Sequence, residues 1–251
     1  MDKRIGAQLY TVRDFCKTEE DFDITLSKIN EIGYKTIQVS GVGPIDANKI
    51  KAIADKYGLE IVCTHKSFAD FTENLEKVIY EHKVLGCEIA GIGGIPMEYW
   101  DKVEEFVEIF NPIAEKVKKA GLQFAYHNHA FEFAKVGTEF KMDYLLKNTD
   151  PENFKLILDV YWLAIAGLDP AEFIEKASDR IAAIHFKDLT VDGNNSAMAE
   201  VMEGNLNWDK IIAASKKSTA KCALVEQDIC KKDPFESLKI SYNNLTKQGF
   251  C

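Results

Sequence analysis

Short apolar runs alternate with longer amphipathic segments along the whole chain. The short runs are rich in β-branched and aromatic residues, which predicts strands, whereas the longer segments show helical periodicity. We expect strands near residues 5–11, 36–41, 60–65, 89–94, 123–129, 155–162, 181–188 and 222–228. We expect helices near residues 19–33, 46–57, 71–85, 98–119, 139–148, 170–179, 207–217 and 234–249.

The number and spacing of these units predict the fold. Successive strands begin 24 to 41 residues apart, and eight strand-helix units fill the chain. This arithmetic predicts an α/β protein with a single (β/α)8 TIM barrel domain over residues 1–251. An open doubly wound sheet would need a phosphate-binding turn after its first strand, and residues 8–11 (QLYT) contain no glycine. Residues 91–94 (GIGG) lack the full dinucleotide-binding pattern and are expected to form a tight loop.

Composition narrows the class of protein further. The chain is 46% hydrophobic and 28% charged, which excludes a disordered protein, and its net charge of -9 argues against a nucleic-acid partner. No apolar run approaches the roughly 18 residues of a membrane span, and no apolar signal segment opens the sequence. We therefore expect a soluble, cytoplasmic protein with no membrane partner. Its six scattered cysteines are expected to be reduced thiols.

The histidines give the first functional signal. Four of the five end predicted strands, namely His65, His127, His129 and His185. In a TIM barrel the active site is built at the carboxyl ends of the strands, so these side chains are expected to meet there. The fifth, His82, lies in a predicted helix, where we expect it at the surface.

Strand periodicity selects four residues as candidate metal ligands. Alternate side chains of a strand share a face, which places one ionisable residue from each of four consecutive strands at the mouth of the barrel: His127, Asp159, His185 and Glu226. Buried charges need a partner, and this ligand set suits Mn, Co, Zn, Fe or Mg better than Ca. The sequence therefore predicts a divalent metal site. A metal-free hydrogen-bond network of the same residues is the alternative.

Five segments resemble the sugar phosphate isomerase/epimerase family, which has a xylose isomerase-like TIM barrel. They are residues 6–13 (GAQLYTVR), 126–133 (YHNHAFEF), 158–162 (LDVYW), 184–188 (IHFKD) and 225–228 (VEQD). The family includes sugar epimerases, hydroxypyruvate isomerase and inosose dehydratase. The endonuclease IV nucleases are more distant relatives, and their three-metal centre requires more histidines than this chain contains.

The resemblance implies specific ligands. Family members hold a metal with glutamate, aspartate, histidine and glutamate from strands five to eight, and the last three correspond to Asp159, His185 and Glu226. His127 stands where the first glutamate is usual. In the epimerases two glutamates exchange protons with opposite faces of the substrate, so this replacement argues against a simple two-base epimerase. The His-x-His pattern resembles the inosose dehydratase-like and keto-sugar-processing relatives, with His129 as a further base.

Several residues receive expected roles at this site. Glu226 is expected to combine metal binding with base catalysis. Lys187 is expected either to polarise a carbonyl or to form an ion pair with Asp159, Glu226 or Asp228. The candidate substrate-binding residues, for each of which a purely structural role is the alternative, are Gln8, Tyr10, Gln38, His65, Glu132 and Trp162.

The resemblance implies a metal-dependent isomerase or epimerase that removes a proton next to a metal-polarised carbonyl. Acidic residues in the loops after strands seven and eight disfavour phosphate, so the expected substrate is a non-phosphorylated sugar, keto-sugar or inositol derivative. The alternatives are a lyase of the inosose or 3-keto-glycoside dehydratase type and a non-catalytic, metal-bearing sugar-binding barrel. The sequence leaves open whether identical chains associate into a homo-oligomer.

Overall fold

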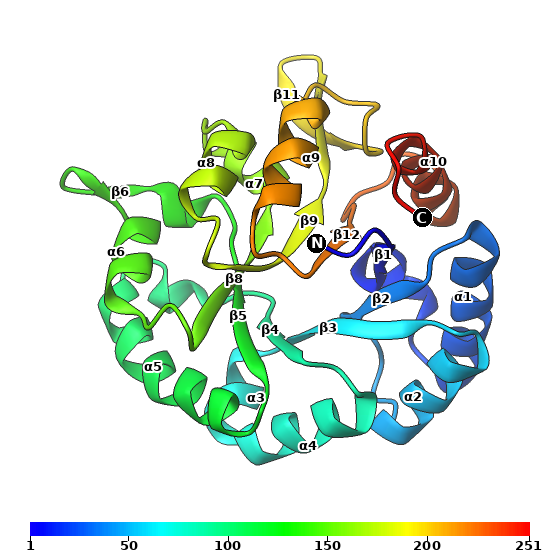
Figure 1. Cartoon of the computed structure of the whole chain (residues 1–251), viewed down its shortest axis with the longest axis horizontal. Coiled ribbons are helices and arrows are strands. Elements are labelled where there is room, and N and C mark those ends of the chain that lie inside the picture. Colours follow the sequence, from blue (N-terminus) through cyan, green and yellow to red (C-terminus); the bar gives the residue numbers. More distant parts are fainter.

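The predicted (β/α)8 barrel is confirmed by the computed structural model, which describes residues 1–251 (Figure 1). The barrel strands are β1 (Ile5–Gln8), β2 (Thr36–Val39), β3 (Glu60–Lys66), β4 (Ile89–Ile92), β5 (Gln123–His127), β8 (Phe154–Asp159), β9 (Ile181–Phe186) and β12 (Cys222–Val225). They close in the order β1-β12-β9-β8-β5-β4-β3-β2, and every neighbouring pair is parallel.

A ring of helices surrounds the strands (Figure 1). The α-helices are α1 (Glu19–Ile32), α2 (Ala47–Lys56), α3 (Phe68–Glu73), α4 (Leu75–Leu85), α5 (Val103–Lys119), α6 (Lys141–Asn148), α7 (Val160–Ile165), α8 (Pro170–Lys176), α9 (Trp208–Lys217) and α10 (Pro234–Thr246). Three short 3-10 helices are η1 (Leu9–Phe15), η2 (Met97–Tyr99) and η3 (Phe131–Phe133). Two hairpins pair β6 (Lys135–Val136) with β7 (Glu139–Phe140) and β10 (Asp188–Asp192) with β11 (Asn195–Ala199).

Two hydrophobic clusters hold the barrel together. The larger contains 60 buried residues and joins the strands to the surrounding helices. The smaller, of 8 buried residues, includes Ala125, Ile157, Ala183 and Leu224, which the strand periodicity assigned to the face inside the barrel. These small and aliphatic side chains fill the barrel interior, so the polar side chains further along the same strand faces gather at its mouth.

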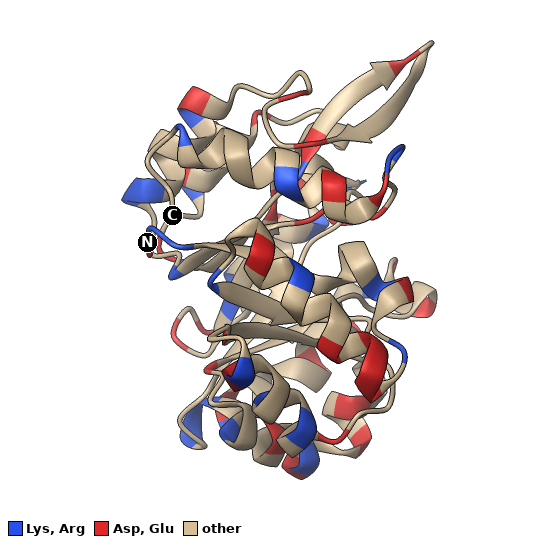
Figure 2. Cartoon of the chain, turned by 90° about the vertical axis from the view of Figure 1, so that its right-hand side faces the viewer, with Lys and Arg blue, Asp and Glu red and all other residues tan.

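Several strands end earlier than their patterns predict. The first strand ends at Gln8 and the chain continues into η1. The sixth ends at Asp159 rather than Trp162, because the Asp159 carboxylate accepts hydrogen bonds from the backbone N–H groups of Tyr161 and Trp162 and so caps α7. The hairpin β10–β11, which the sequence did not predict, projects from the barrel (Figure 2).

The prediction that His82 lies at the surface is wrong. Its side chain is fully buried on the face of α4 that packs against β3. Nδ1 lies 2.7 Å from the carbonyl oxygen of Val78, and Nε2 lies 2.7 Å from the hydroxyl of Thr64. Burial lowers the pKa of His82 to about 4, so the ring is neutral and both of its nitrogens have partners.

Asp188, the last residue of the 184–188 segment, anchors the loop between β11 and α9. Its buried carboxylate accepts hydrogen bonds from the backbone N–H groups of Leu189, Met202, Gly204 and Leu206 and from the indole of Trp208. A Cβ atom at Gly204 would lie 2.5 Å from this carboxylate, which explains the glycine. Asp188 therefore has a structural role in this motif.

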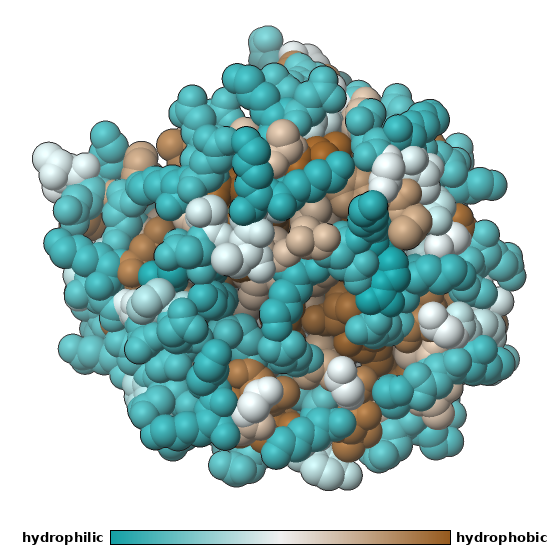
Figure 3. Space-filling view, in the orientation of Figure 1, coloured by the Kyte–Doolittle hydropathy of each residue, from teal (hydrophilic) through white to brown (hydrophobic).

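The remaining surface features are unremarkable for a chain of this composition. Charges of both signs are spread over the helices (Figure 2), and the face in Figure 3 is mostly hydrophilic. All six cysteines are free, as predicted. None of the helices combines the length and the apolar character that crossing a membrane requires.

Candidate active site

A cavity of about 660 Å³ opens at the carboxyl ends of the barrel strands. Seven residues selected from the sequence line it: Tyr10, His65, His127, His129, Trp162, Lys187 and Glu226. Lining residues that were not selected include Ser40, Lys66, Ser67 and Phe68. Ser40 and Ser67 lie in the loops after β2 and β3, Lys66 ends β3 and Phe68 begins α3. The sequence showed no cluster of ionisable residues at these positions. The cavity thus combines polar strand ends with side chains from the loops above them.

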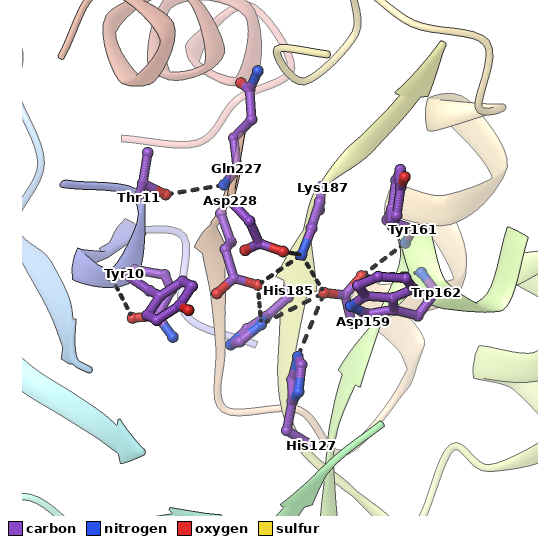
Figure 4. A network of polar contacts seen from close by, with 12 residues as sticks. Tyr10, Thr11, His127, Asp159, Tyr161, Trp162, His185, Lys187, Gln227 and Asp228 are labelled. Carbon is purple, nitrogen blue, oxygen red and sulfur yellow. Dashed lines mark hydrogen bonds and ion pairs between the residues drawn. The ribbon is translucent and has the colours of Figure 1, made fainter. Parts of the chain in front are cut away.

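The four predicted ligands converge beside this cavity, and Figure 4 labels three of them, His127, Asp159 and His185. One ligand atom from each of His127, Asp159, His185 and Glu226 can be chosen so that all lie within 4.8 Å of one another. Nε2 of His127 is 3.4 Å from Oδ2 of Asp159, and Nδ1 of His185 is 3.0 Å from Oε2 of Glu226. All four residues are buried, so the cluster is rigidly held and shielded from solvent.

The two carboxylate oxygens of Asp159 have different roles: Oδ1 caps a helix, and Oδ2 belongs to the candidate metal site. Oδ1 accepts the N–H groups of Tyr161 at 2.8 Å and Trp162 at 3.3 Å, which fixes the carboxylate plane at the start of α7. Oδ2 faces His127, His185 and Lys187 (Figure 4). A residue used as a helix cap is therefore also a member of the cluster.

Lys187 is buried among three carboxylates. Its Nζ lies 2.6 Å from Oδ2 of Asp228, 3.3 Å from Oε2 of Glu226 and 3.5 Å from Oδ2 of Asp159. Burial favours the neutral amine, but the three carboxylates outweigh it and raise the pKa of Lys187 above its usual value. Burial likewise opposes ionisation of Asp159 and Glu226, yet the ammonium and the neighbouring imidazoles lower the pKa of both carboxyls. The ion pair foreseen for Lys187 is present.

His185 contacts an acceptor through each ring nitrogen. Nδ1 donates to Glu226 at 3.0 Å and Nε2 donates to Oε1 of Gln38 at 2.8 Å. Burial opposes the charged form, but Glu226 and Asp159 raise the pKa of His185 to about 9. Gln38 thus orients the ring and leaves Nδ1 directed at the two carboxylates, an arrangement found for metal-binding histidines. Gln38 itself is fully buried and does not line the cavity.

The cluster has the donor set and the unused atoms that a divalent cation needs. Both ring nitrogens of His127 and Oδ2 of Asp159 are buried and make no hydrogen bond. Unpaired buried polar atoms cost free energy, and two imidazoles with two carboxylates are a suitable set for a transition metal or Mg. The residues present therefore fit a metal, which would exchange with the proton on Nδ1 of His185.

Glu132 lies behind the site instead of lining the cavity. Its buried carboxylate accepts hydrogen bonds from the Tyr126 hydroxyl at 2.7 Å and from the backbone N–H of His129 at 2.9 Å. It therefore holds the loop that follows β5. Burial, and then the proximity of His127, lower the pKa of His129 to about 3, and Nδ1 of that ring is buried without a partner.

Glu132 is expected to make stability depend on pH. Burial raises its pKa from the usual 4.5 to about 7, so the folded protein holds this proton more tightly than the unfolded chain. The stabilisation from the protonated Glu132 side chain is complete below the pKa of this group in the unfolded chain. It is lost as the pH rises through the folded-state pKa of about 7. We expect the free energy of unfolding to fall by as much as about 3 kcal/mol between roughly pH 5 and pH 9 through this group.

Urea unfolding at several pH values measures this effect. Glu132→Gln, which stays neutral, should remove most of the decline. Glu236→Gln, an exposed glutamate on α10, is the matched control and should keep it. Parallel stability-against-pH curves for the wild type and Glu132→Gln would contradict the assignment.

His65 and Gln8 complete the lower part of the site. The amide nitrogen of Gln8 lies 3.4 Å from Nδ1 of His65, while Nε2 of His65 is buried without a partner. Gln8, like Gln38, is fully buried outside the lining of the cavity. Gly93 lies directly against the His65 ring. A Cβ atom at this position would be only 2.8 Å from Nδ1 of His65, so a side chain would collide with the ring. Of the residues 91–94 predicted to form a tight loop, Gly91 and Ile92 instead end β4, and only Gly93 and Gly94 lie in the loop that leaves room for His65.

Comparisons with known proteins agree with this architecture. A family model described as "xylose isomerase-like TIM barrel" matches residues 26–228. An inosose dehydratase of Geobacillus kaustophilus is 23% identical over 201 residues, which are 68% of this chain and 63% of that protein. The aligned part therefore spans less than two thirds of that relative.

Solved structures show the same fold over the full length. A sugar phosphate isomerase/epimerase of Parabacteroides distasonis superimposes with a TM-score of 0.80 and 25% identity, covering 100% of this chain and 96% of that one. A probable 3-DHS dehydratase of Bacillus anthracis gives a TM-score of 0.73 at 17% identity, covering 97% and 98%.

Proposed function

This chain belongs to the xylose isomerase-like TIM barrel family, and from that premise we propose that it is a metal-dependent enzyme acting on a non-phosphorylated keto-sugar or keto-inositol. The observation that carries the proposal is the convergence of His127, Asp159, His185 and Glu226 within 4.8 Å beside a cavity of about 660 Å³. A divalent cation held by these residues would supply a Lewis acid for a substrate carbonyl. The proposed reaction begins with removal of a proton from the carbon next to that carbonyl.

Glu226 is proposed as the base. Its Oε2 contacts His185 and Lys187, whereas Oε1 makes no hydrogen bond to the protein and belongs to a residue that lines the cavity. The lowered pKa of Glu226 keeps it ionised and able to accept a proton. His129 lines the cavity and its Nδ1 is buried without a partner, so we assign it to binding a substrate hydroxyl.

The charges of the cavity support a substrate without phosphate. Two lysines line it, and each is already paired with carboxylates: Lys66 with Glu81, and Lys187 with Asp228 and its neighbours. No arginine lines the cavity, and Glu226 and Asp228 both do. A phosphate dianion would therefore find no unpaired cation.

Isomerisation and elimination both begin with the same proton removal. An isomerase needs a single base that returns the proton to the neighbouring carbon, and Glu226 is a single carboxylate of that kind. Elimination needs in addition a proton donor for the departing hydroxyl, and the Lys187 ammonium lines the cavity, although its raised pKa makes it a weak acid. The name of the inosose dehydratase relative favours elimination as the second candidate.

Proton exchange in deuterated water tests the common step. The manganese-loaded protein is incubated with inososes, unphosphorylated ketoses and 3-keto-glucose, and nuclear magnetic resonance follows loss of the proton next to the carbonyl. We expect exchange with at least one of them, loss of exchange on chelation, and recovery on adding Mn²⁺. Isomeric and unsaturated products separate the two candidates. Exchange that is insensitive to chelation, or absent with every compound, would refute the proposal.

A further inference from the structure

A second cavity adjoins the active site. It has a volume of about 460 Å³ and shares five lining residues with the first cavity: Gly93, Gly94, Ile95, His129 and Trp162. Its other lining residues are Trp100, Ala130 and Phe131. We call this second cavity the annex. The five shared residues place the two cavities side by side at the mouth of the barrel.

The outer wall of the annex is an ordered aromatic stack. The rings of Trp100 and Phe131 lie 4.6 Å apart at an angle of 10°, and the Trp100 indole donates a hydrogen bond to the carbonyl of Ile95 at 3.3 Å. Trp100 remains 38% exposed although it is fixed in this way. The two residues come from loops after β4 and β5, so the stack lies above the barrel rather than in its core.

The lining chemistry of the annex selects an apolar occupant. No aspartate, glutamate, lysine or arginine lines it, and five of its eight residues are hydrophobic. A second sugar ring would bury hydroxyl groups with few partners there, which is costly, whereas a flat apolar ring gains contact with the aromatic wall. The Nε1 donor of Trp162 is buried without a partner, and Trp162 lines both cavities.

We propose that the substrate is a conjugate of a keto-sugar ring with an aryl group, and that the aryl group packs in the annex. The proposal rests on the proposed function, because the active site places the sugar ring. Trp100 and Phe131 are then specificity-determining residues that contact the aryl group and take no part in proton removal.

Calorimetric binding of two glucosides tests the annex directly. Phenyl β-D-glucopyranoside and methyl β-D-glucopyranoside differ only in the group that the annex would receive. We expect the wild type to bind the phenyl compound at least about tenfold more tightly, consistent with burial of an aromatic ring. Trp100→Ala and Phe131→Leu should lose most of this preference. Met97→Ala, an exposed neighbour outside both cavities, should keep it.

The outcomes separate this proposal from the proposed function. Three results would overturn the annex assignment, whatever the deuterium-exchange experiment gives. They are equal affinities for the two glucosides, no binding of either glucoside, and an unchanged phenyl preference in both annex variants. A phenyl preference that depends on Trp100 would support the annex even if no keto-sugar shows chelation-sensitive exchange, in which case only the proposed function fails.

Discussion

Glu226→Gln is expected to lower turnover of a keto-sugar substrate by at least about 10³-fold while leaving the barrel folded. The substitution removes the proposed base, and general base catalysis contributes roughly 10²- to 10⁴-fold. It also replaces a carboxylate ligand with a neutral amide, which weakens cation binding. The shape of the side chain is retained, so the barrel should still fold, but the thermal unfolding temperature should fall because His185 and Lys187 lose a charged partner.

A second measurement separates loss of the base from misfolding. Glu226 makes the largest attractive contribution to the raised pKa of His185, so in the metal-free variant this pKa should fall below the wild-type value of about 9. Nuclear magnetic resonance of the imidazole reports it. Turnover within tenfold of the wild type in a variant with a lowered His185 pKa would reject Glu226 as the base.

Lys187→Met is expected to destabilise the metal-free protein by about 3–5 kcal/mol. Three carboxylates, those of Asp159, Glu226 and Asp228, then share only the His185 imidazolium, and removing one partner of a buried ion pair leaves uncompensated charge. Adding Mn²⁺ should restore much of the loss, because the cation replaces the missing positive charge.

Thermal unfolding with and without Mn²⁺ measures this coupling. The stabilisation by Mn²⁺ should be larger for Lys187→Met than for the wild type. Lys231→Met, which removes an exposed ion pair with Asp192, should change stability by no more than about 1 kcal/mol and leave the Mn²⁺ effect unaltered. A Lys187→Met protein as stable as the wild type without metal would show that the three carboxylates need no compensating cation.

The convergence of the four candidate ligands was predictable because it depends on regular structure. Parallel strands end at one side of a barrel and alternate residues face inward, so His127 at the end of β5 and Asp159 at the end of β8 had to approach each other. The register pairs His127 with Ile157, two residues before Asp159 on the same strand face, and Nε2 of His127 lies 3.4 Å from Oδ2 of Asp159. The same regularity correctly separated the filled interior, represented by Ala125, from the polar mouth.

The features of the site that the sequence patterns did not predict depend on contacts between segments that follow different strands. Trp100 and Phe131 are 31 positions apart in unrelated loops, and no periodicity indicates their stacking. The side chain of Gln38 points into the barrel, as strand alternation predicts. Alternation does not say how deep in the barrel a residue lies, so it could not tell whether the Gln38 amide contacts a ligand or the ring of His185. His82 illustrates the same limit for helices, since its burial depends on how closely α4 packs against β3.

We propose that His127, Asp159, His185 and Glu226 together bind one divalent cation. Titration of the metal-stripped protein with Mn²⁺, followed by electron paramagnetic resonance of the free ion, measures this directly. The wild type should bind one equivalent per chain, and Asp159→Asn should bind at least about tenfold more weakly, since a ligating carboxylate is lost. Absence of stoichiometric binding by the wild type, or equal binding by Asp159→Asn, would contradict the account.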